Sequence, residues 1–149
     1  MGQNIRNNFL IREYQKDDFI GISHLWSVTD MGNPGRGDDE KTIEDSIKIG
    51  GCMLVLTEKV SGTICGTSWM TFDGRRIHLH HFGILPEHQG IGLANNLMKA
   101  SLKHAKIKGY QVKLEVHRSN FKAICLYKKS GFEYLGDYDV YIIRDISKI

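Results

Sequence analysis

The sequence has no long apolar run, and this absence excludes a helix that crosses a membrane. The longest uninterrupted apolar stretch covers only residues 52–56, whereas a membrane-spanning helix needs about 20 such residues. The first twenty residues are polar and lack the apolar core of a signal peptide. We therefore expect a cytoplasmic protein with no membrane partner.

Cysteine is also scarce, and no run of basic residues is present. Cys52, Cys65 and Cys125 are widely spaced and match neither a disulfide framework nor a zinc knuckle, so we expect them to be small buried hydrophobes. The net charge is only +3, with Lys and Arg scattered along the chain. This pattern argues against a nucleic-acid partner, although a mild basic excess still favours a small anionic ligand.

The length and composition are typical of one soluble globular domain covering residues 1–149. Apolar residues make up 41% of the 149 residues and charged residues 25%, a profile that excludes a disordered chain. Glycine is the abundant exception, because the chain has 16, roughly 11% against a usual value of about 7%.

Hydrophobic periodicity and turn residues predict a mixed order of strands and helices. Strands are predicted over 9–14, 53–58, 62–72, 75–85, 111–117, 132–136 and 138–144. Helices are predicted to begin at 17–18 and at Asp38, and to cover 90–108 and 120–130, with a loop over 31–37. The fold class is therefore α/β (α+β), with a mixed central sheet of about seven strands flanked by about four helices.

A glycine-rich turn precedes the predicted helix 90–108. Because Gly90 and Gly92 lack a Cβ atom, a ligand can approach the backbone closely, and the free N–H groups of a first helical turn favour phosphate. A Walker loop would need Gly-Lys-Ser/Thr, and a dinucleotide fingerprint would need a small residue where Asn95 stands. Neither motif is present. A glycine-rich helix start without any ligand is the plain alternative.

A second motif lies on the predicted helix 120–130. Ser119 or Asn120 is placed to cap this helix, and Tyr127 shares a face with Ala123. A tyrosine at such a position is ordinarily a core residue with a paired hydroxyl group. The functional alternative is a phenol that points toward the glycine turn and donates a proton.

Together the two motifs resemble those of the GNAT (N-acetyltransferase) superfamily. Residues 89–94 are similar to its Q/R-x-x-G-x-G/A pyrophosphate loop, and residues 120–132 to its Asn–Tyr–Gly-Phe pattern. The resemblance implies a GNAT-like domain with a sheet splayed between its fourth and fifth strands. It also implies acetyl transfer from acetyl-CoA, as cosubstrate, to an amine, without a metal.

The resemblance further assigns the cofactor-binding residues. Pantetheine would pair with Phe82, Gly83 and Ile84, where Gly83 is consistent with a bulge. Asn120 would hold the pantetheine arm, and the N–H near Ile84 would stabilise the oxyanion. Tyr127 would protonate the departing thiolate, since a phenol is protonated at pH 7. The pyrophosphate would rest on Gln89, Gly90, Ile91, Gly92, Leu93 and Ala94.

The general base is open among several residues. Glu115 leads a stretch similar to bacterial ribosomal-protein N-terminal acetyltransferases, in which a glutamate here is a candidate base. His78, His80 and His81 are rivals, His80 above all, because it shares a strand face with His78 and Phe82. Three close histidines also suggest a metal site, but no cysteine or clear carboxylate partner accompanies them, and we expect no metal.

The acceptor is expected over the first two helices, as it is in the family. Acidic residues there could attract a cationic amine, either a small molecule or a peptide or protein amine; helix capping and a solvated face are the alternative reading. The acidic residues are Asp30, Asp38, Asp39, Glu40, Glu44 and Asp45. A catalytically silent CoA-binding module, acting as a sensor or interaction partner, is the alternative function. No motif specifies the oligomeric state, although homodimers are common in the family.

Overall fold

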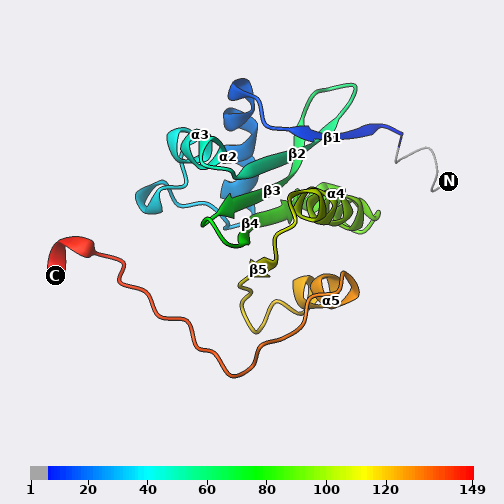
Figure 1. The fold of residues 1–149 in the computed structure, drawn as a ribbon. Coiled ribbons are helices and arrows are strands. Elements are labelled where there is room, and N and C mark those ends of the chain that lie inside the picture. The colour runs from blue at the N-terminus through cyan, green and yellow to red at the C-terminus, as the bar shows by residue number, and fades with distance from the viewer. Residues whose placement is uncertain (1–6) are drawn as a thin grey trace.

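A computed structural model describes residues 7–149, so residues 1–6 of the predicted domain lie outside it. The described part contains four α-helices and five strands, together with short 3-10 turns (Figure 1). In chain order they are β1 (Phe9–Glu13), α2 (Phe19–Val28), α3 (Glu40–Lys48), β2 (Cys52–Glu58), β3 (Ile64–Phe72), β4 (Ile77–Ile84), α4 (Leu93–Lys108), β5 (Val112–Leu114) and α5 (Phe121–Lys129).

The strands form one mixed sheet in the order β1-β2-β3-β4-β5. The first three pairings are antiparallel, which confirms the predicted meander, and β5 joins β4 in parallel. Pairing between β4 and β5 begins at Ile77 with Val112 and ends at Leu79 with Leu114. Beyond this point β4 continues to Ile84 without β5 beside it. The sheet thus opens between its fourth and fifth strands.

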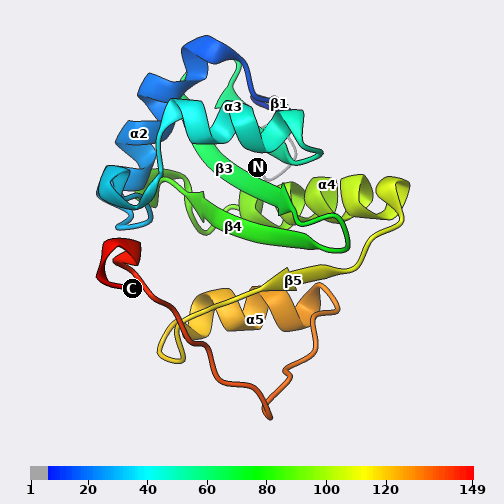
Figure 2. The ribbon, with the colours of Figure 1, turned by 60° about the vertical axis from the view of Figure 1, so that its left-hand side comes forward.

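Each face of the sheet carries its own hydrophobic core. On one face α4 contributes buried Leu97 and Met98 to a cluster with the strands, and Tyr127 of α5 packs at its margin. On the other face α2 and α3 contribute Trp26 and Ile43. The helices therefore enclose the sheet as two layers (Figures 1 and 2), and both faces of the central strands are filled.

The last two predicted strands are wrong for this structure. Residues 133–149 form no strand and extend outward beyond α5, ending in the short turn Ile146–Lys148 (Figure 1). A strand is stable only beside another strand that pairs with its backbone, and apolar patterning alone does not supply that neighbour. For the same reason β5 is shorter than the predicted 111–117, because its pairing with β4 stops at Leu114.

The predicted cap of α3 is displaced by one residue. Asp39, rather than Asp38, accepts a hydrogen bond from the backbone N–H of Thr42 at 2.7 Å. Asp38 instead accepts from the N–H of Asn33 at 2.7 Å, and its Oδ1 lies 3.2 Å from Nε2 of His81. The loop before α3 is thereby brought against β4.

The cysteines divide into two groups. Cys52 and Cys65 are buried, as predicted, but Cys125 is exposed on α5, which corrects the prediction for that residue. Among residues 7–149, none of the helices combines the length and apolar character needed to cross a bilayer.

Candidate active site

A β-bulge in β4 shapes the centre of the site. Thr67 pairs with Gly83 but Trp69 pairs with His80, so β4 holds one extra residue between these pairs. The left-handed conformation falls on His81, with φ of 43°, and not on Gly83, where the glycine had suggested a bulge. A Cβ on Gly83 would lie 2.5 Å from Cε of Met31, so this glycine makes room for a covering side chain.

A buried chain of hydrogen bonds holds the bulge. Nε1 of Trp26 donates to Oγ1 of Thr67 at 3.0 Å, and that hydroxyl donates to the carbonyl oxygen of His81 at 2.8 Å. Thr67 is fully buried. The hydrogen bond from Thr67 to this carbonyl stabilises the left-handed backbone at His81, a conformation that is uncommon for residues other than glycine.

The bulge breaks the alternation of β4, so that consecutive side chains His80 and His81 line the same pocket. This pocket has a volume of about 440 Å³ and lies where β4 and β5 separate. It brings together four of the residues predicted from the sequence, Phe82, Glu115, Asn120 and Tyr127. The remaining lining residues are Asp30, Met31, His78, Leu79, His80, His81, Val116 and His117.

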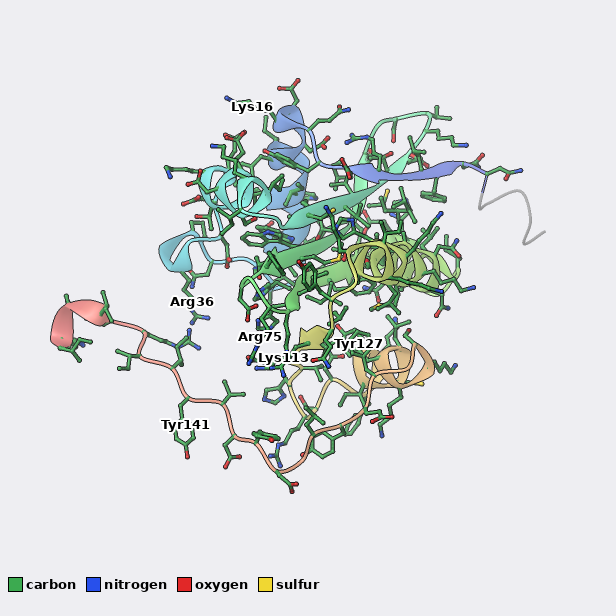
Figure 3. All side chains as sticks on the ribbon, viewed as in Figure 1. Lys16, Arg36, Arg75, Lys113, Tyr127 and Tyr141 are labelled. Carbon is green, nitrogen blue, oxygen red and sulfur yellow. The ribbon has the colours of Figure 1, made fainter. Side chains whose placement is uncertain are left out.

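Tyr127 lies in this pocket on the face of α5 that points toward the sheet (Figure 3). Its ring meets Phe82 edge to face, with centroids 6.3 Å apart, and Phe132 at 5.7 Å. Burial raises the pKa of the phenol above its ordinary value. Tyr127 therefore keeps its proton throughout the neutral range and can act as an acid.

Two histidines of β4, His78 and His80, have a lowered pKa that favours the neutral imidazole. Burial, followed by the neighbouring His78 and His81, lowers the pKa of His80 to about 4, and its Nε2 lies 2.8 Å from Oγ1 of Thr71. Burial also lowers the pKa of His78, whose ring centroid is 4.0 Å from that of His80. In the described part of the chain, no three His, Cys, Asp or Glu side chains are grouped to hold a metal ion.

Glu115 follows directly after β5 and belongs to the same pocket. Its carboxylate is solvent-exposed, and its Oε1 lies 3.8 Å from Nζ of Lys113. From this position the carboxylate can accept a proton from a group bound in the pocket. The structure thus offers a carboxylate from one side and neutral imidazoles from the other.

The glycine turn before α4 presents a row of free backbone donors. Gly90 and Gly92 adopt left-handed conformations, with φ of 80° and 88°. Within residues 7–149, the N–H groups from Gly90 to Ala94 donate to no backbone or side-chain oxygen of the chain. Space is open around Gly90, where an added Cβ would meet nothing within 4 Å. Such a turn at a helix N-terminus is suited to an anion.

Gln89 ties this turn to the pocket. Its side-chain amide donates to the carbonyl of Ile84 at 2.9 Å and accepts from Nζ of Lys122 at 2.8 Å, while its own N–H donates to Pro86. The backbone N–H of Gln89 and one N–H of its side-chain amide are therefore engaged within the chain, and its predicted part in holding a ligand stays a prediction. The contact places the first turn of α5 beside the glycine turn.

The sequence reasoning missed Lys122. A cation in the first turn of a helix opposes the helix dipole, and this mismatch is the signal that could have identified it as a partner for an anion. Asn120 caps α5 as predicted, because its Oδ1 accepts from the N–H of Ala123 at 3.2 Å. The side-chain NH₂ group of Asn120 remains as a donor toward the pocket.

We compared the sequence and the fold with those of known proteins. The profile of the Acetyltransferase (GNAT) family matches residues 10–132, which include the glycine turn, α5 and all of the sheet except Phe9. The chain belongs to the GNAT acetyltransferase family. The protein is accordingly an acetyltransferase, and acetyl-CoA is the acetyl donor of this family.

Solved structures share the fold of this GNAT acetyltransferase at low sequence identity. An acetyltransferase of the GNAT family from Staphylococcus aureus is 16% identical, with a TM-score of 0.75 and 88% of each chain covered. A spermidine N-acetyltransferase from Vibrio cholerae is 22% identical, with a TM-score of 0.70 and coverage of 87% of this chain and 82% of its own.

A third structure, glucosamine-6-phosphate N-acetyltransferase from Arabidopsis thaliana, is 20% identical, with a TM-score of 0.68 and coverage of 93% and 98%. The acceptors named for these GNAT enzymes include a polyamine and an amino sugar phosphate. The shared fold therefore leaves the acceptor of this GNAT acetyltransferase undetermined.

Proposed function

We propose that the protein transfers the acetyl group of acetyl-CoA directly to a primary amine, through a tetrahedral intermediate. The observation that carries this proposal is the adjacency of two features. Free N–H groups from Gly90 to Ala94 stand at one end of α4, and the contact of Gln89 with Lys122 joins this turn to the helix that carries Tyr127.

The donor would be held by the backbone and by two side chains. The diphosphate of acetyl-CoA accepts hydrogen bonds from the free N–H groups of the glycine turn, with the charge of Lys122 close by. Such charge-assisted bonds are about twice as strong as neutral ones. Pantetheine pairs with the open edge of β4 over Phe82, Gly83 and Ile84, and Asn120 donates its amide to the same arm.

The acetyl transfer then follows from the groups in the pocket. The neutral amine attacks the thioester carbonyl carbon, and the oxyanion accepts a hydrogen bond from the backbone N–H near Ile84. Glu115 takes the proton that the amine loses. When the carbon–sulfur bond breaks, the electron pair stays on sulfur and Tyr127 gives the thiolate its proton. The thiol of CoA keeps that proton, Glu115 passes its own proton to solvent, and solvent reprotonates the phenolate of Tyr127.

The acceptor would be a cationic amine from a peptide or protein or from a small molecule. Two carboxylates, those of Asp30 and Glu115, line the pocket, and Asp38 lies against His81 at its margin. These charges attract an ammonium group. The similarity of the Glu115 stretch to ribosomal-protein N-terminal acetyltransferases favours a peptide amine.

The test is thiol release from acetyl-CoA across a panel of peptide, lysine, polyamine and amino-sugar acceptors. Tyr127→Phe should lower kcat by about 10²–10⁴ on the best acceptor and leave CoA affinity almost unchanged. Tyr110→Phe is the matched control, since Tyr110 packs on Phe72 outside the pocket. CoA binding without turnover on every acceptor would favour the silent CoA-binding module instead.

A further inference from the structure

A second cavity, with a volume of about 200 Å³, lies apart from the pocket of Tyr127. Its walls come from the end of β1, the segment between α3 and β2, and the last two turns of α4. Both α3 and α4 end on the right-hand side of Figure 2. None of the residues that line this cavity lines the pocket of Tyr127. The two hollows are therefore separate sites.

The length of α4 keeps this cavity away from the acetyl donor. The helix has 16 residues and is thus about 24 Å long, at 1.5 Å per residue. Its first turn follows the glycine turn, whereas His104 and Lys108 line the cavity near its last residue. A small ligand in the cavity must be recognised by groups that take no part in acetyl transfer.

The cavity carries two side chains of opposite charge that do not pair with each other. Glu13 ends β1 and Lys108 ends α4, and the ion pairs found within residues 7–149 include neither of them. Burial raises the pKa of the Cys52 thiol to about 11, Glu13 raises it further, and Lys108 lowers it. Both charges therefore act on the same thiol, and each is available to a ligand.

The α4 side of the cavity is suited to a carboxylate. His104 lies four residues before Lys108, so the two side chains share one face of the helix. Burial, followed by the charge of Lys108, lowers the pKa of His104, which favours the neutral imidazole with one N–H donor. A carboxylate that accepts from this N–H and from the ammonium group of Lys108 gains a charge-assisted hydrogen bond.

The opposite side of the cavity is suited to an ammonium group. The carboxylate of Glu13 supplies a full negative charge there. Helix α3 ends at Lys48, and Ile47, Gly50 and Gly51 from this end line the same cavity. The carboxyl end of a helix carries a partial negative charge. It therefore adds to the attraction that Glu13 exerts on a cation.

The floor of the cavity is apolar, and its size limits the ligand. Cys52 and Met53 are 5% and 1% exposed, and the raised pKa keeps the thiol of Cys52 protonated. The volume of about 200 Å³ is below the range of about 300–1,000 Å³ that is usual for pockets of drug-sized ligands. The ligand is therefore small, with at most a short apolar side chain.

We propose that this cavity binds a small free amino acid as its zwitterion. The carboxylate group of the ligand lies on His104 and Lys108, its ammonium group lies on Glu13, and its side chain packs on Cys52. A simple amine or a simple carboxylate leaves one of the two charged walls without a partner. The proposal does not depend on the roles proposed for Glu115 and Tyr127.

Titration of the full chain with free L-alanine, followed through its ¹⁵N–¹H resonances, tests the proposal. We expect saturable shifts of the amides of Gly50, Gly51, Cys52 and Lys108. N-acetyl-L-alanine, which lacks the ammonium group, and ethylamine, which lacks the carboxylate, should bind at least about tenfold more weakly, because each loses a charged hydrogen bond.

Three results of this titration would overturn the proposal. One is the absence of saturable shifts with L-alanine at the four amides. Another is a set of shifts confined to the pocket of Tyr127, which would mean that L-alanine binds there as an acceptor. The third is equal affinity for the three compounds, which would show that the cavity does not recognise both charges.

Charge-removing variants provide the second measurement. Glu13→Gln and Lys108→Gln should each raise the Kd for L-alanine at least about tenfold. The matched controls are Glu133→Gln and Lys103→Gln, which lie outside the cavity and should leave the Kd unchanged. All four side chains are exposed, so the substitutions leave the core intact. Equal Kd values in the variants and their controls would contradict the proposed site.

Discussion

Replacing Thr67 by valine tests how the bulge of β4 is held. Valine keeps the shape of the side chain but removes the hydroxyl that accepts from Trp26 at 3.0 Å and donates to His81 at 2.8 Å. Because Thr67 is fully buried, water cannot replace either bond. An unsatisfied buried group costs about 1–3 kcal/mol, so two of them predict a loss of about 2–6 kcal/mol in the free energy of unfolding.

The same change should alter catalysis. Without the hydrogen bond from Thr67, the backbone at His81 can relax out of its left-handed conformation. The side chains of β4 that line the pocket then shift. We expect the KM for acetyl-CoA to rise several-fold and kcat to fall by about tenfold, since misplacement of this size near reacting groups is costly. Urea unfolding and steady-state thiol release measure the two effects separately.

Ser68→Ala is the matched control for Thr67→Val. Ser68 is the next residue of β3 and is also fully buried, but its hydroxyl contacts Ser101 at 2.7 Å on the α4 side. It should lose about 1–2 kcal/mol of stability with unchanged kinetic constants. Wild-type stability together with wild-type kinetics in Thr67→Val would contradict the claim that Thr67 holds the bulge. An equal loss of activity in Thr67→Val and Ser68→Ala would contradict it as well.

Three further predictions follow from the same structure. Gly90→Val should weaken CoA binding by about 10–100-fold as its side chain fills the donor turn, whereas Gly74→Val, also left-handed and in open space, should leave the Kd measured by calorimetry unchanged. Glu115→Gln should remove the acidic limb of the pH profile of kcat/KM, and His80→Ala should retain it; the reverse result would assign the base to the histidine. Burial opposes ionisation of Asp18, but two hydrogen bonds from Arg12 outweigh it and hold the pKa of Asp18 below its ordinary value. The stability that these hydrogen bonds give is therefore present above the unfolded-state pKa of Asp18. It is lost as the pH falls through the folded-state pKa. Asp18→Asn should therefore cost about 1.5–3 kcal/mol at pH 7 and flatten the acid dependence of urea unfolding.

The order of the central elements could be predicted from sequence because local signals are strong there. Asp73 and Gly74 specify the turn between β3 and β4, and Gly109 ends α4 in a left-handed conformation. Both faces of β2 meet a helix layer, so the strand is buried over residues 52–57 and reads as a short apolar run, which predicts a buried strand. The glycine turn and the helix of Tyr127 could also be predicted, because their motifs lie within the short stretches 89–94 and 120–132.

The bulge and the course of residues 133–149 could not be predicted from local pattern. The left-handed residue of the bulge is His81, and this conformation is uncommon for residues other than glycine. It is held by Thr67 and Trp26, from elements distant in the sequence. The pattern of residues 138–144 predicts a strand, but the segment forms none, because a strand depends on a neighbouring edge with which to pair. Lys122 likewise gains its role only when Gln89 is brought beside it.

The central claim is that backbone amides of the glycine turn bind the diphosphate of the acetyl donor next to Tyr127. The most direct test follows the ¹⁵N–¹H resonances of the protein during titration with CoA and, separately, with pantetheine, which lacks the diphosphate. The account predicts that the amides of Gly90 to Ala94 shift strongly with CoA and remain in place with pantetheine, while the amides around Tyr127 shift with both. Saturable binding of CoA that leaves the amides of Gly90 to Ala94 unmoved would contradict it.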